Sequence, residues 1–462
     1  MNSNGKRNGC GDICLHTRRD FLRSTLLGGA LTWTVPTFLA ETFSTLHLNA
    51  ADSAVQVATG KDASILVILQ LAGGNDGLNT VVPYANDFYR KARPTLGLPA
   101  DKVLKIDDAI ALHPSLGGFK ALYDEGHLSI VQGVGYPNPN RSHFRATEIL
   151  ETASDAESSE KYGWVGRYFD NACPGSDPTV GVAIAGETPQ AFWAPKPRGV
   201  TLKNPNAYRF MAGGGMEGGE AEADGLYREL NQSTQAADAT AAAVGHDASS
   251  GGSIGSIGGG SPGNSSLSPL NFIERTALDA QASSDKIQAI AKAGKNVATY
   301  PNSGLANDLK LVARLIGGGL STRVYFASQG GYDTHTNQLN TQARLLQELG
   351  DSLAAFCADL KAQGNFERVT IMTFSEFGRR VTENASQGTD HGVACPQFIV
   401  GGRVKGGLAG EYPSLDPAKL DHGDLVHTVD FRSVYAGLLE NWLGTPSDKI
   451  LNGSFAPLTV TV

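Results

Sequence analysis

The chain has 462 residues, a net charge of −8 at neutral pH and a hydrophobic content of 41%. This length exceeds the usual limit of one hydrophobic core, so we expect either one large α/β domain with insertions or two domains. The negative charge argues against nucleic acid or anionic lipid as a partner. Of the five cysteines, Cys10 and Cys14 lie near the N-terminus, and the other three, Cys173, Cys357 and Cys395, form no close pair, so neither a disulfide framework nor a thiolate metal cluster is indicated.

The first residues carry the pattern of an export signal. The pair Arg18-Arg19 is followed by Phe21 and Leu22, and then by an uncharged stretch over residues 24–40. Glycine and proline interrupt that stretch, which is shorter than the roughly 20 apolar residues of a membrane-spanning helix. We therefore predict a cleaved twin-arginine signal at residues 1–50. An ordinary basic amphipathic N-terminus is the alternative.

The export prediction fixes the expected location and one partner of the protein. The twin-arginine translocation machinery would bind the signal, and the mature protein would be periplasmic or secreted, without a stable membrane anchor. The signal contains five basic and three acidic residues, so its removal would change the net charge from −8 to −10.

Continuous aliphatic runs, each next to a polar or glycine-rich turn, predict buried strands of a mostly parallel sheet. These runs are Ser64–Leu71, Leu128–Val134, Arg323–Ala327, Val369–Phe374 and Gln397–Val400. Helical patterns lie between them at Leu116–Glu125, Ser142–Thr152, Leu305–Ile316, Thr341–Gln363 and Phe431–Leu443. The alternation predicts an α/β fold with a doubly wound sheet flanked by helices.

Residues 201–300 interrupt this alternation. They include the Gly/Ser tract Ser249–Ser268, whose composition is too polar and too rich in glycine to bury a core. We predict a partly helical, partly disordered insertion there. It would separate the first part of the α/β domain, residues 51–200, from the second part, residues 301–462.

Polar side chains follow the first two predicted strands, where doubly wound sheets bind their ligands. Asp76 follows the first strand as either a cation-binding carboxylate or a turn residue. Ser142 opens a predicted helix beside Arg141, after a stretch that holds Pro137 and Pro139. It is a candidate nucleophile, and the alternative is a plain helix N-cap.

Two Asp/His pairs and one Glu/Arg segment follow later in the chain. Asp333 and His335 lie two residues apart after a strand, a combination that suits zinc, manganese or iron, although an Asp turn with a surface histidine is the alternative. The pair Asp390-His391 lies beside another strand. In a separate segment, Glu376 precedes Arg379, which either grips an oxyanion or forms an internal ion pair.

Several motifs together resemble those of exported bacterial proteins known as domain of unknown function 1501. The motifs are the twin-arginine leader, Leu71–Gly77, Asn140–Phe144, Gly331–His335, Ser375–Arg379 and Asp390–Gly392. They run from the leader to near residue 445, so the resemblance covers almost the whole chain. This family is similar in layout to the alkaline phosphatase and sulfatase superfamily.

The superfamily resemblance implies a divalent metal cofactor, namely zinc, manganese or calcium, and a small anionic ester substrate. The ligands it implies are Asp76, Asp333, His335, Glu376 and His391. It also implies Ser142 as the nucleophile, with Arg141 or Arg379 stabilising developing charge. The superfamily usually has an Asp-His pair where this chain has Glu376-Phe377, so one ligand of a two-metal site is missing.

The function implied is metal-assisted hydrolysis of phosphate or sulfate esters in the exported compartment. Two alternatives remain at this point. One is a non-catalytic exported binding protein on the same fold, and the other is a structural or assembly protein of the cell envelope.

Overall fold

The computed structural model describes residues 63–174, 176–195, 199–205 and 283–461. The predicted signal at residues 1–50 and the Gly/Ser tract Ser249–Ser268 lie outside these ranges. None of the helices within the described ranges has the length and apolar character needed to cross a bilayer.

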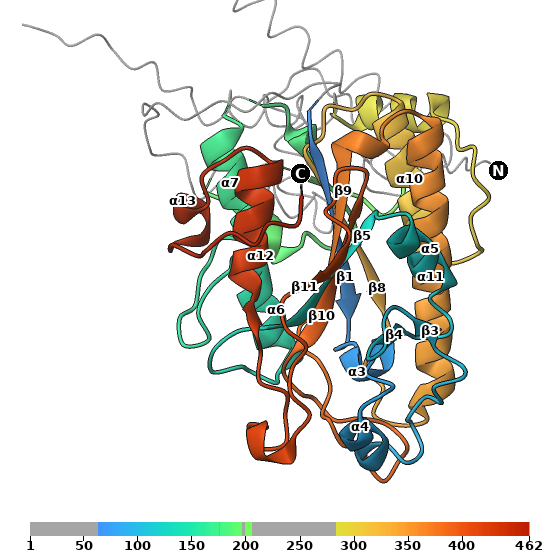
Figure 1. Cartoon of the computed structure of the whole chain (residues 1–462). Coiled ribbons are helices and arrows are strands. Elements are labelled where there is room, and N and C mark those ends of the chain that lie inside the picture. The colour runs from blue at the N-terminus through green and yellow to red at the C-terminus, as the bar shows by residue number, and fades with distance from the viewer. Residues whose placement is uncertain (1–62, 175, 196–198, 206–282, 462) are drawn as a thin grey trace, which may run out of the picture. The chain divides into compact units, whose positions relative to one another are not determined.

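A mixed, mostly parallel sheet forms the centre of the described structure (Figure 1). Its strands follow the order β11-β5-β10-β9-β1-β8-β6-β7, and β12 also pairs with β5. Only β10 runs antiparallel to its neighbours β5 and β9. The strand bounds are β1 Ile65–Ala72, β5 Leu128–Gly135, β6 Gly181–Ile184, β7 Val200–Thr201, β8 Val324–Gly330, β9 Val369–Phe374, β10 Cys395–Gly401, β11 Gly407–Ala409 and β12 Val429–Asp430.

The five strands expected from the aliphatic runs are confirmed as β1, β5, β8, β9 and β10. The strands of this sheet that the sequence did not indicate are β6, β7, β11 and β12, which have only two to four residues each. A run of two to four residues is too short to show the hydrophobic pattern by which a strand is recognised in a sequence. The antiparallel direction of β10 has a consequence for the site, because the segment before β10 then lies at the carboxyl edge of β1, β8 and β9.

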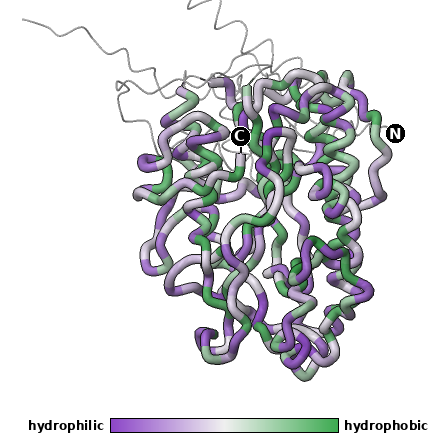
Figure 2. Tube along the Cα trace, in the orientation of Figure 1, coloured by the Kyte–Doolittle hydropathy of each residue, from purple (hydrophilic) through white to green (hydrophobic). Residues whose placement is uncertain are grey.

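Helices cover both faces of the sheet, as expected for a doubly wound fold (Figure 1). One face carries α5 Gly117–Asp124, α10 Gly304–Gly317 and α11 Gln338–Ala362. The other carries α6 His143–Thr152, α7 Trp164–Ala172, α12 Phe431–Gly437 and α13 Asp448–Leu451. Green and purple segments alternate along α10 and α11 (Figure 2), because one side of each helix faces the sheet.

Strand β1 connects the two apolar cores. Val67 and Leu69 pack into the core beneath α10 and α11, whereas Leu66 and Ile68 pack into the core beneath α7 and α12. All four side chains are at most 1% exposed. Burial of each such side chain contributes on the order of 1.5–3 kcal/mol, so the central strand is held firmly from both sides.

A small second sheet lies beyond the carboxyl end of β1. Its order is β2-β4-β3, and it is accompanied by two short helices. The bounds are α3 Gly77–Thr80, β2 Val81–Val82, α4 Asp87–Ala92, β3 Leu104–Lys105 and β4 Ala111–Leu112. At the other end of the chain, α12 continues into a π-helical turn at Leu438–Trp442.

Candidate functional site

Four chain segments converge at the carboxyl edge of the sheet. They are the turn after β1, the start of α6, the turn after β8 and the segment before β10. The turns after β1 and β8 approach closely at Gly73, whose φ is +119° and where a Cβ atom would lie 2.4 Å from the backbone nitrogen of Asp333. Only glycine permits both this conformation and this contact. The Gly73 amide also donates to Glu376 Oε1 over 2.7 Å.

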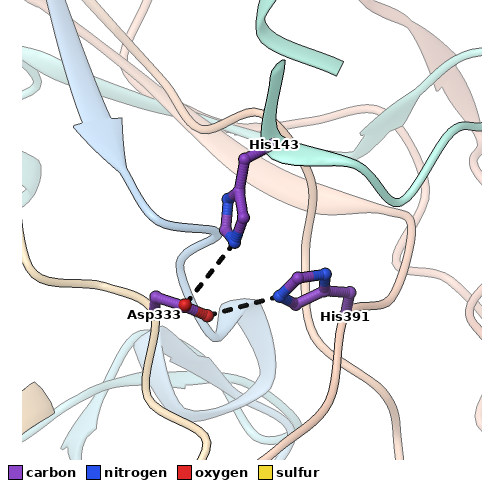
Figure 3. Close-up of side chains that lie close together, drawn as sticks. All are labelled: His143, Asp333 and His391. Atoms are coloured by element: carbon purple, nitrogen blue, oxygen red, sulfur yellow. Dashed lines mark hydrogen bonds and ion pairs between the residues drawn. The ribbon is translucent and has the colours of Figure 1, made fainter. Parts of the chain in front are cut away.

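Three imidazole rings surround the carboxylate of Asp333. The Nε2 atoms of His335 and His391 lie 3.1 Å and 3.3 Å from Asp333 Oδ1. The Nε2 atom of His143 lies 3.6 Å from Asp333 Oδ2. Figure 3 shows His143 and His391 pointing at this carboxylate from the start of α6 and from the segment before β10. The side chain of Asp333 is 48% exposed, so the cluster is open to solvent.

Each of these rings has a second partner at its other nitrogen. Nδ1 of His143 lies 2.8 Å from Glu376 Oε1, and Nδ1 of His335 lies 3.2 Å from Asp390 Oδ1. Nδ1 of His391 lies 2.8 Å from the carbonyl oxygen of Arg141. All three outer partners are oxygen acceptors.

The outer partners fix the tautomers of the neutral rings. A carbonyl oxygen has no proton, so Nδ1 of His391 must donate to it, and the carboxylates of Asp390 and Glu376 require the same of the other two rings. In the neutral rings the lone pairs therefore reside on the Nε2 atoms. His335 Nε2 and His391 Nε2 face each other over 3.0 Å. Facing lone pairs repel unless a proton or a metal cation lies between them.

The Asp333 carboxylate is ionised in this setting. Partial burial acts to raise its pKa, but the net shift is downward, chiefly because Arg379 donates a hydrogen bond to the carboxylate and carries a positive charge. The Arg379 side chain is fully buried and donates to Asp333 Oδ1 over 2.7 Å. It also donates to backbone carbonyls of Gly73, Gly74, Tyr332 and Thr389.

These contacts give Arg379 a structural part in the site. Its guanidinium joins the turns after β1 and β8 and has little left to offer an oxyanion from solvent. Of the two outcomes that the sequence left open for Arg379, the internal ion pair is therefore present, but its partner is Asp333, and Glu376 instead binds His143.

The donor set fits a transition metal. Ligand atoms of His143, Asp333 and His391 all lie within 4.8 Å of one another. Imidazole nitrogens with a carboxylate suit zinc, manganese or iron. Metal-ligating histidines usually give their second N–H to a carboxylate or a carbonyl, which is the arrangement found at each ring here. His335 adjoins the group through Asp333 and His391, and Glu376 adjoins it through His143.

Asp76 lies apart from these residues, in a buried polar network. Its side chain is 1% exposed, and Oδ2 accepts from Arg93 Nη1 over 2.6 Å and from Gln338. The other oxygen, Oδ1, is buried without a hydrogen-bond partner. Arg93 is itself buried and donates to the carbonyls of Val381 and Arg380. A guanidinium therefore already balances the charge of Asp76.

Ser142 occupies the N-cap position of α6. Its φ and ψ of −86° and 127° are extended, and its side chain forms no capping hydrogen bond. The Ser142 amide donates to Asn140 Oδ1 over 2.8 Å, which orients the residue at the exposed start of the helix. The hydroxyl is therefore not used in capping, and it lies next in sequence to the His143 ring.

The ligands expected from the sequence did not include His143 or Asp390. Both belong to motifs that it did single out, since His143 follows Ser142 and Asp390 precedes His391. Each lies next to a candidate residue in the sequence, and this position was the signal that could have identified it. Arg93 had no such signal, because it lies in an ordinary charged helix end at α4.

The fold and site define an α/β protein with a histidine-rich candidate metal centre at the carboxyl edge of its sheet. Residues 264–436 match the protein family described as "Protein of unknown function (DUF1501)", which confirms the family resemblance over the segment that holds Gly331–His335, Ser375–Arg379 and Asp390–Gly392. No curated protein matches the chain.

Several solved structures match at low similarity. The lipoteichoic acid synthase LtaP from Listeria monocytogenes is 9% identical with a TM-score of 0.36, and the match covers 87% of this chain and 78% of that one. A protein in the alkaline phosphatase superfamily from Vibrio parahaemolyticus is 9% identical with a TM-score of 0.30, over 80% and 70% of the chains. The PsFucS1 sulfatase from Pseudoalteromonas sp. is 11% identical with a TM-score of 0.33, over 82% and 69%. TM-scores this low carry no argument about activity.

Proposed function

We propose that this protein is a metal-dependent hydrolase of phosphate or sulfate esters. The observation that supports the proposal most is the convergence of three Nε2 atoms on the Asp333 carboxylate, where neutral rings would present their lone pairs. Such an arrangement is unfavourable without a positive charge at its centre, and the outer hydrogen bonds hold each ring in the orientation of a ligand. His143, Asp333 and His391 would hold the cation, with His335 beside them.

The identity of the cation follows from the donor atoms. Calcium prefers a shell of six to eight oxygen ligands, and this group offers mostly nitrogen. Zinc and manganese accept imidazole and carboxylate together. We therefore narrow the expected cofactor from zinc, manganese or calcium to zinc or manganese.

The charges around the cluster favour the binding of a cation, and the site that holds the cation would in turn favour the binding of an anion. With neutral histidines, four carboxylates face three guanidiniums, which leaves one excess negative charge; a divalent cation would reverse the sign. The residues counted are Asp333, Glu376, Asp390, Asp424, Arg141, Arg379 and Arg380. An anionic ester would then be attracted to the loaded site.

The proposed chemistry divides among the residues of the chain. When bound, a divalent cation would supply a Lewis acid that polarises the ester oxygens. Ser142 would present its hydroxyl, which makes no capping hydrogen bond, at the start of α6, where the helix dipole and free N–H groups favour an anion. Arg379 would hold the Asp333 carboxylate in place, and Arg141 would offer its half-exposed guanidinium to the anionic substrate.

Ser142→Ala provides the direct test. We expect this variant to lose turnover of p-nitrophenyl phosphate and p-nitrophenyl sulfate, while its bound metal and thermal stability stay nearly unchanged. Stability should change little because the Ser142 side chain makes no capping hydrogen bond. A residue that served only as a cap would show the reverse, with about 1 kcal/mol of stability lost and turnover preserved.

Metal content gives the second arm of the test. Mass spectrometry of the purified protein should find zinc or manganese, and His391→Ala should lower its content. His127→Ala is the matched control, because His127 precedes β5 at the opposite edge of the sheet and packs on Phe366. A wild-type protein without metal in the exported compartment would contradict the hydrolase proposal.

A second candidate is a non-catalytic exported binding protein. The Arg379–Asp333 ion pair of 2.7 Å favours it, because the guanidinium partly neutralises the carboxylate without any cation. Bound metal without turnover of either ester would select this candidate.

Export is part of the proposed function. The Arg18-Arg19 pair and the short, interrupted apolar stretch after it support delivery by the twin-arginine route. The hydrolase would then act on small anionic esters in the periplasm or outside the cell.

A further inference from the structure

A buried carboxylate joins two arginines at the rim of the candidate metal centre. The side chain of Asp424 is fully buried, and its carboxylate forms an ion pair with Arg141 Nη2. Arg380 Nε lies 3.7 Å from the other oxygen, Asp424 Oδ1, which has no hydrogen-bond partner. We call Arg141 and Arg380 the arginine pair, and we call Asp424 its anchor.

The backbone ties both arginines to the segment that carries His391. The Arg141 carbonyl accepts from His391 Nδ1 over 2.8 Å, and the Arg380 amide donates to the Asp390 carbonyl over 3.0 Å. Arg141 also precedes Ser142, and Arg380 follows Arg379. The anchor arrives from the chain segment between β11 and β12, far from both arginines in sequence.

The arginine pair differs from Arg379 in what it can still bind. Arg379 is fully buried, and carbonyls and Asp333 occupy its donors. The Arg141 and Arg380 side chains are 39% and 38% exposed, and together they share a single carboxylate. Because the two guanidiniums share one carboxylate and are more than a third exposed, they keep N–H donors that can bind a further anion.

We propose that the arginine pair binds a second anionic group of the substrate. The favoured substrate would then be an ester that carries a further phosphate, sulfate or carboxylate beside the group that is cleaved. Asp424 acts as a positioning residue, because it holds both guanidiniums without contacting the substrate. The catalytic part of this proposal rests on the proposed function, whereas the binding part does not.

Two unreactive ligands test the proposal by calorimetry on the full chain. Phenylphosphonate carries one anionic group, and 4-carboxyphenylphosphonate adds a carboxylate on the far side of the ring. We expect the wild-type protein to bind the carboxylated ligand about tenfold more tightly, as one additional charge-assisted contact provides. Arg380→Ala should bring the two affinities together while leaving that for phenylphosphonate unchanged.

Three further variants support the interpretation. Arg380→Gln should show the same loss of preference and serves if Arg380→Ala does not fold. Asp424→Asn should weaken the preference, because the guanidiniums lose their anchor. Arg403→Ala is the matched control: this exposed arginine follows β10 at the opposite edge of the sheet and should keep the wild-type preference.

The outcomes separate this proposal from the proposed function. Equal wild-type affinity for the two ligands, binding of neither, or a preference that survives in Arg380→Ala and Arg380→Gln would overturn the arginine subsite. A loss of affinity for both ligands alike would also overturn it, because the arginine would then bind the phosphonate itself. A preference that depends on Arg380 in a protein without esterase turnover would support the subsite and reject only the hydrolase activity.

Discussion

The carboxylate of Asp76, a ligand expected from the sequence, is paired with a buried guanidinium. Its partner Arg93 is as buried as Asp76 itself, and the two side chains lie 2.6 Å apart. Asp333, in contrast, is half exposed and has imidazoles around it. Two aspartates that both follow a strand therefore differ in what each would do for a cation.

Replacement of Asp76 by asparagine should affect stability more than metal content. We expect Asp76→Asn to lose about 3–5 kcal/mol of unfolding free energy, because it leaves the Arg93 charge buried without a counter-charge. Urea unfolding measures this loss, and mass spectrometry should find wild-type metal content. Asp124→Asn is the control, since Asp124 is 56% exposed and pairs with Lys120 at the surface. Metal loss in Asp76→Asn would place Asp76 among the ligands.

At the scale of secondary structure, the turn 384–388 supports His335. Asn384 Nδ2 donates to the His335 carbonyl, and a Cβ at Gly388 would lie 2.1 Å from the His335 backbone. Between them Gln387 has a φ of 57°, in the left-handed region. This exposed turn therefore includes one residue in an unfavourable backbone conformation.

Gln387→Gly should stabilise the protein by about 0.5–1 kcal/mol. The left-handed conformation costs a residue with a Cβ about 1–2 kcal/mol, and the entropy of glycine in the unfolded chain offsets part of that gain. Thermal unfolding gives the measurement. Ala385→Gly in the same turn is the control, because Ala385 is not among the residues with positive φ, and it should lose a similar amount. Equal effects of the two changes would contradict the argument.

Helix α6 carries a buried carboxyl group whose ionisation opposes folding. Burial raises the pKa of Glu151 to about 7 from 4.5, although an amide of Ala191 donates to it. A pKa raised in the folded state means that stability is fully present below the unfolded pKa and is lost as pH rises. The loss should fall between about pH 4.5 and pH 7 and reach on the order of 3 kcal/mol.

Glu151→Gln should remove much of this pH dependence. The amide keeps an oxygen that accepts from Ala191 and has no charge to bury, so urea unfolding at pH 5 and pH 8 should differ less than in the wild type. Asp308 would contribute to the remaining slope, because burial raises its pKa to about 6. Identical slopes for variant and wild type would show that Glu151 ionises without cost.

At the scale of the whole molecule, export is the property that can be tested in cells. Replacement of Arg18 and Arg19 together by lysine should hold the precursor in the cytoplasm, because the twin-arginine route requires the guanidinium pair and not positive charge alone. Fractionation of cells followed by immunoblotting measures the distribution. Arg23→Lys is the control and should be exported. Export of the double variant at the wild-type level would refute the twin-arginine signal.

The sequence by itself determined the α/β class and the positions of the main strands. Continuous aliphatic runs such as Val369–Phe374 must be buried on both faces, and that requirement is local, so the pattern is visible along the chain. The turns that follow these strands were also visible, because polar residues such as Asp333 and His335 break the aliphatic pattern. The family resemblance came from the same segments.

Only the tertiary structure decided which of these residues meet. The antiparallel direction of β10 brings His391 to the edge where β8 ends, and no local pattern encodes strand direction. Arg93 pairs with Asp76 although it lies in an unremarkable helix end, and Asp424 reaches Arg141 across 283 positions of sequence. The choice of an ionic partner depends on which charges folding brings close together, because burial strengthens nearby charge interactions and leaves distant ones screened by solvent.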